Sequence, residues 1–518
     1  MFSNVHLIWN SGKLIVCYDD NRITIDGDTA LSFTEDVNKR YESYGWHVQT
    51  VEDVNDLEGL YTAMNNAKME LSKPSIIKIR TIIGQGSRNE GTSGVHGAPL
   101  GAADVAHVKK HYGFDPEQSF YVSPEVSQFY QSFKAKGEEI EATWNELFAS
   151  YKAKFPDLAR EYERRLRREL PEDWKNRLPS YTAPETKLLA TRHRSEQVLN
   201  SIADIFTELV GGSADLTPSN LTNLKCSEDH QRDNPGGRYI RFGVREHAMA
   251  AICNGLFAYG FFRPYCASFL NFIGYALGSV RVSALSRFGI IYVMTHDSIG
   301  LGEDGPTHQP VEMLEYLRCT PNLLTIRPAD ANETAGAYEV ALERVHTPAV
   351  LCLSRQVTVN VEGTSRDKVK LGAYVILDLP YVGKNRPDLI IVSTGTELQL
   401  AVHVAKVLAE TCMIGVRVVS MPCCELFDEQ VIEYQVEVFP VGSPVMSIEA
   451  AGTRSWSKYA HASFGIDTYG HSAPAPAVFD YFGFGVPNLV ENAKNVLKFY
   501  NGMDAPSLTL RPKMFRPA

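Results

Sequence analysis

The segment THDSIGLGEDGPTHQP, residues 295–310, combines side chains that can move protons with residues that let a ligand approach the backbone closely. It contains two imidazoles, His296 and His308, and two adjacent carboxylates, Glu303 and Asp304. Imidazole gains or loses a proton near neutral pH, and glycine, which occurs three times here, has no Cβ to keep a ligand away from the backbone. The segment therefore predicts a loop that binds a polar ligand and exchanges protons with it.

The residues before this loop predict the element that positions it. Residues 288–294, FGIIYVM, are mostly apolar and partly β-branched, which is typical of a buried strand in a parallel sheet. Ligands of open α/β sheets bind outside the carboxyl ends of the strands. We therefore expect the loop to leave a central strand and to line a binding site.

A metal site, a calcium loop and an ordinary surface loop are three other interpretations of this segment. A metal site would need ligands at shorter spacing than that between His296 and His308, and no cysteine joins them. A calcium loop would need alternating Asp and Asn residues and a terminal Glu, and this pattern is missing. An ordinary surface loop is the third interpretation of the segment taken alone.

The composition indicates a globular protein of several domains. A chain of 518 residues is long enough for three domains at about 150 residues each, and its hydrophobic (44%) and charged (22%) fractions are ordinary. The formal charge of −10 argues against a nucleic-acid binder, and no stretch approaches the roughly 18 apolar residues of a membrane span. The nine cysteines are scattered without a CxxC pair, and the first residues do not resemble a secretory signal. These features predict reduced thiols in a cytoplasmic protein.

Strand and helix patterns alternate along much of the chain, which favours an α/β fold with parallel sheets. Besides residues 288–294, the expected strands cover residues 13–18, 75–80, 349–355, 389–393, 416–420 and 444–448. Helical spacing is expected over residues 138–168, with an interruption at Pro156, and over residues 398–410. No GxGxxG follows any expected strand, so a dehydrogenase-like protein has no support.

Five motifs follow one another in the middle of the chain. They are GGSADLTPSN, FGVREHAM, ASFLNF, the opening loop and LSR, at residues 211–220, 242–249, 267–272, 295–310 and 353–355. In this order the set resembles transketolase, a thiamine-diphosphate enzyme. The likeness extends upstream through DDNRITIDG and GVHGAPL, at residues 19–27 and 94–100, and downstream through SFGID at residues 463–467. The resemblance implies transfer of a two-carbon ketol unit between sugar phosphates.

The resemblance also implies an architecture: three α/β domains with parallel sheets in a thiamine-diphosphate-binding fold. The implied parts are an incomplete diphosphate-binding domain at residues 1–156, a helical linker at 157–185, a pyrimidine-binding domain at 186–365 and a C-terminal domain at 366–518.

The resemblance implies where the cofactor binds. Thiamine diphosphate needs a carboxyl group beside its aminopyrimidine ring, and Glu246 in FGVREHAM matches that position. The alternative for Glu246 is a helix-start glutamate that pairs with Arg245. The implied aromatic pocket and two further cofactor contacts are Phe269, Phe272, Tyr275, Asp215 and Ile83. Taken alone, the three aromatic residues are spaced like the buried face of a helix.

Other residues match the substrate site of the family. The histidines that would exchange protons with substrate hydroxyl groups are His96, His296 and His308, and Asp304 would bind a hydroxyl group. The positions that would bind a sugar phosphate are Arg192, Ser219 and Arg355. An arginine at the end of a strand is usually a surface residue, so the two arginines rest on the resemblance.

The metal site departs from the family pattern. The diphosphate is held through Mg²⁺ or Ca²⁺, and Asn21 and the carbonyl of Ile23 match two of the ligands. The Gly-Asp-Gly motif that carries the aspartate ligand is not found in this sequence, nor is the upstream half of its domain. We therefore expect an incomplete first domain and weak binding of the cofactor by this chain alone.

Three functions follow from this departure. The first is transketolase itself, which would form a homodimer. The second is a short paralogue that is inactive alone and regulates, or forms a heterodimer with, a full-length transketolase. The third is dihydroxyacetone synthase, although Ser219 in LTPSN favours phosphorylated substrates.

Overall fold

The computed structural model describes residues 12–181, 188–379 and 385–510, and these residues form two compact units. Unit 1 comprises residues 1–160 with residues 231–235, and unit 2 comprises residues 161–230 and 236–518.

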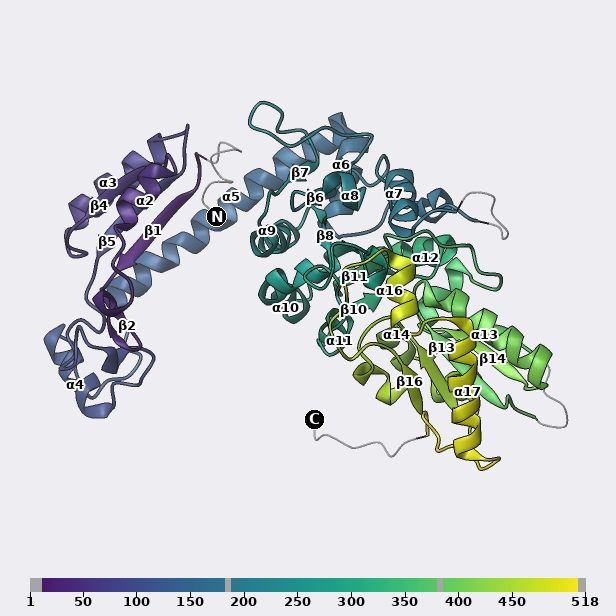
Figure 1. Ribbon diagram of the computed structural model, residues 1–518. Coiled ribbons are helices and arrows are strands. Elements are labelled where there is room, and N and C mark those ends of the chain that lie inside the picture. The colour runs from purple at the N-terminus through teal and green to yellow at the C-terminus, as the bar shows by residue number, and fades with distance from the viewer. Residues whose placement is uncertain (1–11, 182–187, 380–384, 511–518) are drawn as a thin grey trace. The chain divides into compact units, whose positions relative to one another are not determined.

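Unit 1 is built on a three-stranded parallel sheet in the order β1-β5-β4 (Figure 1). The strands are β1 (Ile15–Asp20), β4 (His47–Val51) and β5 (Ser75–Arg80), with a short hairpin of β2 (Ile23–Thr24) and β3 (Gly27–Asp28). Its helices are α2 (Val37–Ser43), α3 (Leu57–Met69), α4 (Ala102–His111) and α5 (Pro124–Lys154). Val51, Ala63, Ala67 and Ile77 bury the face between α3 and the sheet.

The long helix α5 has sequence signals at both ends. Ser123 accepts a hydrogen bond from the Val126 N–H at 3.3 Å, and Pro124 occupies the first helical position, where no N–H is needed. Pro156 then begins α6 (Pro156–Leu166), as the expected interruption at this proline indicates. The helix expected from residue 138 begins earlier than predicted, since α5 starts 14 residues before that position.

Unit 2 contains two sheets. The first has six strands, all parallel, in the order β10-β11-β9-β8-β6-β7. They are β6 (Leu209–Ser213), β7 (Tyr239–Arg241), β8 (Arg263–Phe269), β9 (Ile291–Thr295), β10 (Leu324–Ile326) and β11 (Ala349–Leu353). The expected strand at residues 288–294 is therefore β9, shifted toward the loop. Because β6, β8, β9 and β11 are buried along their whole length, their apolar runs lack alternation.

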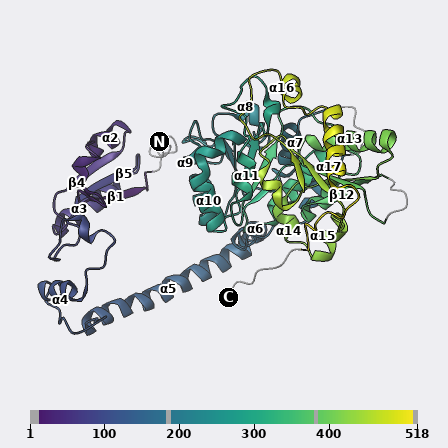
Figure 2. The same ribbon diagram turned by 60° about the horizontal axis from the view of Figure 1, so that its bottom comes forward.

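Helices cover this six-stranded sheet. They are α7 (Thr191–Ile202), α8 (Thr217–Asn220), α9 (Glu246–Tyr259), α10 (Leu277–Leu285), α11 (Met313–Arg318) and α12 (Ala331–Glu343). Helix α9 packs against β8 and lies beside α10 in both views (Figure 2). A 3₁₀ helix, η4 (Leu270–Ala276), connects β8 to α10.

The second sheet of unit 2 has the order β12-β14-β13-β15-β16. Its strands are β12 (Tyr374–Asp378), β13 (Leu389–Ser393), β14 (Val416–Ser420), β15 (Val445–Ile448) and β16 (Ala462–Phe464). Its helices are α13 (Glu397–Cys412), α14 (Cys424–Asp428), α15 (Ile432–Val438), α16 (Ala475–Tyr481) and α17 (Val486–Tyr500), with α13 packed beside α17 (Figure 1). The expectation of parallel strands alone is wrong here, because β12 pairs antiparallel with β14.

All nine cysteines are free, in agreement with the expectation of reduced thiols. Within the described residues, no helix combines the length and apolar character needed to cross a membrane.

Candidate active site

The ring of Phe269 and the imidazole of His296 stack at the carboxyl edge of the six-stranded sheet. Phe269 ends β8 and is paired with Thr295, which ends β9, so the two chain ends leave the sheet side by side. The ring centroids of Phe269 and His296 are 3.7 Å apart with 28° between the planes, and both side chains are buried. The sheet edge thus holds one face of the imidazole in place.

His296 has an unusual backbone and an unusual charge state. Its φ of +62° lies in the left-handed region, which a non-glycine residue adopts only where the surroundings enforce it. Burial, followed by the charges of Arg192 and Arg355, lowers the pKa of His296 to about 3. The imidazole is therefore neutral at physiological pH.

His308 contacts the same aromatic rings. Its ring is 5.1 Å from the ring of Phe272 and 6.3 Å from that of Phe269, in edge-on contacts. Its Nδ1 lies 2.9 Å from the hydroxyl of Thr307, and Asn271 Nδ2 donates to the Thr307 carbonyl at 2.6 Å. The structure thus brings both histidines of the loop to one aromatic cluster.

Two arginines lie near His296. Arg192 Nη1 donates to the backbone carbonyl of Ser219 at 2.8 Å, which links α7 to α8. Burial and the neighbouring charge of Arg355 lower the pKa of Arg192 from its ordinary value, so the two cations are close to one another. Arg192 Nε is buried and has no hydrogen-bond partner in the described part of the chain. A buried cationic donor without an acceptor fits an anionic ligand such as a phosphate group.

Glu246 begins α9, the helix that packs against both β8 and η4. The side chain of Arg245 donates to the carbonyl of Phe242 at 2.9 Å and forms no ion pair with Glu246 in the described part of the chain. The half-buried carboxyl group is therefore available to a ligand.

The three expected aromatic residues form a row along the end of β8 and η4, and η4 packs against α9, the helix that Glu246 begins. The ring of Phe272 is 5.6 Å from that of Phe269 and 6.0 Å from that of Tyr275. Tyr275 is 69% exposed, so the spacing of three does not mark a buried helix face; η4 is a 3₁₀ helix. A partly open row of rings, on an element packed against the helix that begins with a carboxyl group, fits the aminopyrimidine of thiamine diphosphate.

Two further expected residues lie on the surface of unit 2. Asp215 follows β6 with a φ of +62° and is exposed. Asp304 is also exposed, in the loop between His296 and His308.

The expected residues of unit 1 lie in two of its loops. Asn21 Oδ1 accepts a hydrogen bond from the Ile23 N–H at 2.9 Å, and both residues are half-buried. Ile83 is half-buried and its carbonyl accepts from the Gly91 N–H at 2.9 Å, whereas His96 is exposed. Mg²⁺ and Ca²⁺ take six or more oxygen ligands, so the Asn21 side chain and the Ile23 carbonyl alone would not complete such a site. No group of three metal-binding side chains was found among the described residues.

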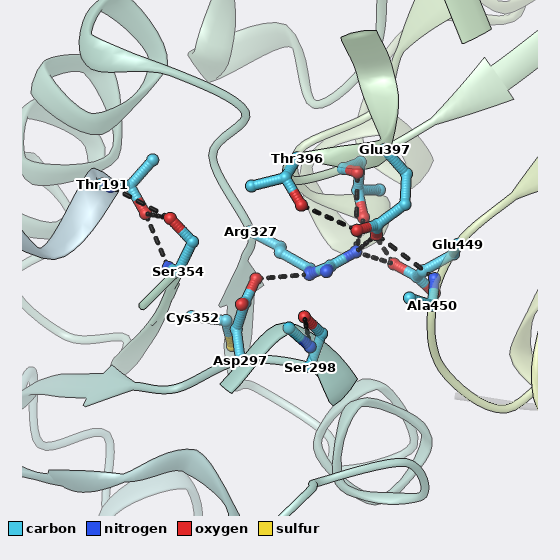
Figure 3. A network of polar contacts seen from close by, with 12 residues as sticks. Thr191, Asp297, Ser298, Arg327, Cys352, Ser354, Thr396, Glu397, Glu449 and Ala450 are labelled. Carbon is cyan, nitrogen blue, oxygen red and sulfur yellow. Dashed lines mark hydrogen bonds and ion pairs between the residues drawn. The ribbon is translucent and has the colours of Figure 1, made fainter. Parts of the chain in front are cut away.

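A buried ionic cluster includes Asp297 of the loop (Figure 3). Arg327 Nε donates to Asp297 Oδ2 at 2.9 Å, and Arg327 Nη1 contacts Glu397 and lies 3.6 Å from Glu449. Glu449 also accepts two hydrogen bonds from Arg318, at 2.7 and 2.8 Å. The cluster therefore connects the residue after His296 to the second sheet of unit 2.

Sequence reasoning missed this cluster, although a signal for it exists. Asp297, Arg327, Glu397 and Glu449 all stand within four residues after a buried strand, at the ends of β9, β10, β13 and β15. Parallel strands of one sheet end at the same edge, which relates Asp297 to Arg327 and Glu397 to Glu449 but does not bring the two pairs together, because they follow strands of different sheets.

Three family models match the chain. They are "Transketolase, thiamine diphosphate binding domain" at residues 5–171, "Transketolase, pyrimidine binding domain" at residues 187–359 and "Transketolase-like TK C-terminal domain" at residues 372–485. The first match does not support the expectation of an incomplete first domain that lacks a metal ligand.

Relatives in other organisms are similar over most of this chain. Transketolase 1 of Saccharomyces cerevisiae is 50% identical over 499 residues, which are 95% of this chain and 72% of the yeast protein. A transketolase of Nostoc is 48% identical over 94% of this chain and 73% of its own length. These relatives do not favour the regulatory paralogue or dihydroxyacetone synthase.

Solved structures of transketolases are also similar to this chain. A Pichia stipitis transketolase in complex with sedoheptulose 7-phosphate has a TM-score of 0.94 and 47% identity, covering 99% of this chain and 76% of that one. A Leishmania mexicana transketolase has a TM-score of 0.93 and 45% identity over 97% of this chain and 74% of its own. The chain belongs to the transketolase family, the thiamine-diphosphate enzymes that transfer ketol groups.

Proposed function

We propose that the edge of the six-stranded sheet around His296 binds the sugar phosphate and controls its hydroxyl protons during ketol transfer. The observation that supports this is the group of three charged or titratable side chains near one buried, neutral imidazole: Arg192, Arg355 and His308 all act on His296. A ketose phosphate offers the matching groups, hydroxyls at one end and a dianion at the other. The Pichia stipitis relative was solved with such a compound.

Glu246 and the aromatic row are proposed to hold the pyrimidine half of the cofactor. When bound, thiamine diphosphate supplies the nucleophilic carbon that attacks the ketose carbonyl. Glu246 would form the hydrogen bond to the aminopyrimidine ring, and Phe269, Phe272 and Tyr275 would pack against it. Asp215 and Ile83 are proposed as further contacts.

His296, His308 and His96 are proposed to bind and move the hydroxyl protons of the substrate, and Asp304 to bind a hydroxyl group. General acid and base groups of this type contribute about 10²- to 10⁴-fold to a rate. Arg192, Arg355 and the hydroxyl of Ser219 are proposed to bind the phosphate.

The metal site, the assembly and the domain bounds are proposed from family membership. Asn21 and the Ile23 carbonyl would bind Mg²⁺ or Ca²⁺.

The protein would act in the cytoplasm as a homodimer or as a heterodimer with a longer transketolase. The proposed domains are residues 1–156, 186–365 and 366–518, with a linker at residues 157–185.

A pair of substrates tests the phosphate site. R355M should raise the KM of a ketose phosphate about 10- to 100-fold, because each charge-assisted bond contributes about 1.5–3 kcal/mol. The KM of the same ketose without its phosphate should change less than about threefold. The control R454M removes an arginine that is 84% exposed and should change neither KM. Equal changes for both ketoses, or none, would show that Arg355 does not bind the phosphate.

A further inference from the structure

A side chain at the end of the candidate-site loop closes the second half of that loop. Gln309 is 1% exposed, and its Nε2 donates to the carbonyl of Gly302 at 3.1 Å and to the carbonyl of His471 at 2.9 Å. The first bond closes a segment that contains Asp304 and His308. The second bond joins this closed segment, residues 302–309, to a part of the chain that follows β16 in the second sheet of unit 2.

The backbone of the closed segment forms two consecutive turns. The Gly305 N–H donates to the Gly302 carbonyl at 3.2 Å, and the N–H groups of His308 and Gln309 donate to the Gly305 carbonyl at 3.0 and 3.1 Å. Asp304 lies inside the first turn, and His308 ends the second. Both proposed substrate-binding side chains therefore depend on one short, closed piece of backbone.

The orientation of the Gln309 amide is determined by its two partners. Backbone carbonyl oxygens can only accept, and the amide nitrogen has one hydrogen for each of them. A reversed amide would place an acceptor against two acceptors and would make neither bond. On its other side, the amide oxygen lies so close to Gly470 that a Cβ there would be only 1.6 Å away. Position 470 must therefore be a glycine for the amide to keep this place.

Two more hydrogen bonds hold the closed segment, and they come from separate elements. Ser472 Oγ donates to the Glu303 carbonyl at 2.5 Å, and Asn271 Nδ2 of η4 donates to the Thr307 carbonyl at 2.6 Å. In both bonds the acceptor is a backbone carbonyl, so the direction of donation is not in doubt. The closed segment is thus fixed both to η4, which carries the aromatic row, and to residues 470–472.

Residues 470–472 are themselves held against the C-terminal part of unit 2. The ring of His471 lies 4.6 Å from the ring of Tyr481 in an edge-on contact and 5.6 Å from the ring of Phe482, with 28° between the latter two planes. Tyr481 ends α16, which packs against η5 (Ile299–Leu301), the turn just before the closed segment. The carbonyl that accepts from Gln309 therefore belongs to a packed part of the molecule.

We propose that Gln309 and Ser472 are positioning residues that hold Asp304 and His308 at the substrate by fixing the closed segment to residues 470–472. This inference rests on the roles proposed above for Asp304 and His308. The C-terminal part of unit 2 then acts on the reaction through the backbone of the loop. A shift of about 1 Å at a reacting group can lower a rate about 100-fold, so a loose closed segment would be costly.

Hydrogen exchange measures the fixation without an activity assay. Exchange is followed by mass spectrometry in the full chain, in peptides that cover residues 300–309. Q309M keeps the length of the side chain but removes both donors, and we expect the amides of the closed segment to exchange at least about 10-fold faster. G470A displaces the amide while Gln309 itself stays, and should have the same effect, so the test does not depend on one variant folding. S472A should give a smaller increase.

A second glutamine provides a matched control. Gln435 in α15 also donates its amide hydrogens to two backbone carbonyls, those of Phe427 and Gln430, at 3.1 Å each. Q435M should therefore leave the exchange of residues 300–309 unchanged. Native exchange of these residues in both Q309M and G470A would overturn the proposal.

Kinetics test whether the fixation acts through the proposed substrate groups. Q309M should lower kcat/KM for a ketose phosphate about 10- to 100-fold. Q309E keeps the shape of the side chain but not the donors, and it should resemble Q309M; native activity in Q309E would show that shape alone suffices and would overturn the proposal.

Double variants locate the effect. In the D304A background the further loss caused by Q309M should be at least about threefold smaller than in the R355M background, because Arg355 lies outside the closed segment. Equal further losses in the two backgrounds would overturn the proposal.

The single variants also separate this inference from the proposed function. If D304A and H308A both retain full activity, the proposed roles of these residues fail, whatever the exchange of the loop. If D304A and H308A lose activity and Q309M does not, the proposed function stands and only the positioning role fails.

Discussion

Arg327 Nε donates a hydrogen bond to Asp297 Oδ2 at 2.9 Å, and neither side chain is more than 1% exposed. Asp297 is the residue after His296, whose left-handed backbone needs support from its surroundings. Burial raises the pKa of Asp297 to about 6, and Arg327 opposes that rise. The ion pair therefore supports the conformation of the loop and compensates the negative charge of Asp297.

Removal of Arg327 should be strongly destabilising. R327M leaves Asp297, Glu397 and Glu449 as buried carboxylates with one cation fewer, and breaking a buried pair in this way costs about 3–5 kcal/mol. Urea unfolding at pH 7 measures the loss. The pair Arg454–Glu315 provides the control: its arginine is 84% exposed, and R454M should cost less than about 1 kcal/mol. A similar loss in both variants would contradict a special role for the buried cluster.

Arg327 leaves no room for a side chain at position 395, which is a glycine. Its φ is +56°, and a Cβ at this position would lie 2.6 Å from Arg327 Cζ. G395A should therefore destabilise the protein by about 1–3 kcal/mol through backbone strain and steric overlap. The double variant R327M/G395A should lose less than the sum of the two single losses, because the shorter methionine relieves the overlap. Strictly additive losses in urea would show that the two residues do not interact.

Glu333 should make stability depend on pH. Burial, followed by repulsion from Asp330, raises the pKa of Glu333 to about 7, and its carboxyl accepts hydrogen bonds from the hydroxyls of Tyr374 and Ser420. The carboxyl is thus protonated in the folded protein where it is already ionised in the unfolded chain. Its stabilising contribution is complete below about pH 4.5 and is lost as the pH rises through about 7, by roughly 3 kcal/mol.

The comparison with E333Q isolates this effect. Glutamine does not ionise, so E333Q should lose less stability between pH 5 and pH 8 than the unsubstituted protein, as measured by urea midpoints. The control E433Q changes an exposed glutamate and should follow the unsubstituted protein. Equal losses in the unsubstituted protein and E333Q would contradict the prediction.

Ser219 allows its hydroxyl to be tested apart from its backbone. Arg192 binds the Ser219 carbonyl, so S219A should leave the arginine in place and remove only the hydroxyl. We expect the KM of a ketose phosphate to rise about 3- to 10-fold, the effect of one hydrogen bond of about 0.5–1.5 kcal/mol. S286A, at an exposed serine, is the control. An unchanged KM in S219A would exclude the hydroxyl from phosphate binding.

The sequence predicted well those elements that local pattern determines. Strands β5, β13 and β14 have the expected bounds, and α13 extends the expected helix by one residue before and two after, because continuous β-branched runs and helical spacing are local signals. The antiparallel direction of β12 could not be predicted in this way, since a strand of five residues looks the same in either direction.

The site was predicted as a set of residues and not as a geometry. Phe269 and His296 were both named from the resemblance, but their stacking depends on the pairing of β8 with β9, which no local pattern encodes. The same holds for Arg327, whose partners come from three separate strand ends. The roles of the named residues stay predictions until the variants are measured.

The Arg327 cluster also bears on how unit 2 opens. Asp297 and Arg327 follow strands of the first sheet of unit 2, and Glu397 and Glu449 follow strands of the second. If the second sheet detached alone, Arg327 would keep Asp297 but lose Glu397 and Glu449, and Glu449 would also lose Arg318. We therefore expect partial opening to be penalised and the amide hydrogens of β9 and β13 to exchange at a common rate. The loop after β9 would then share the slow dynamics of a sheet that contributes none of the proposed site residues.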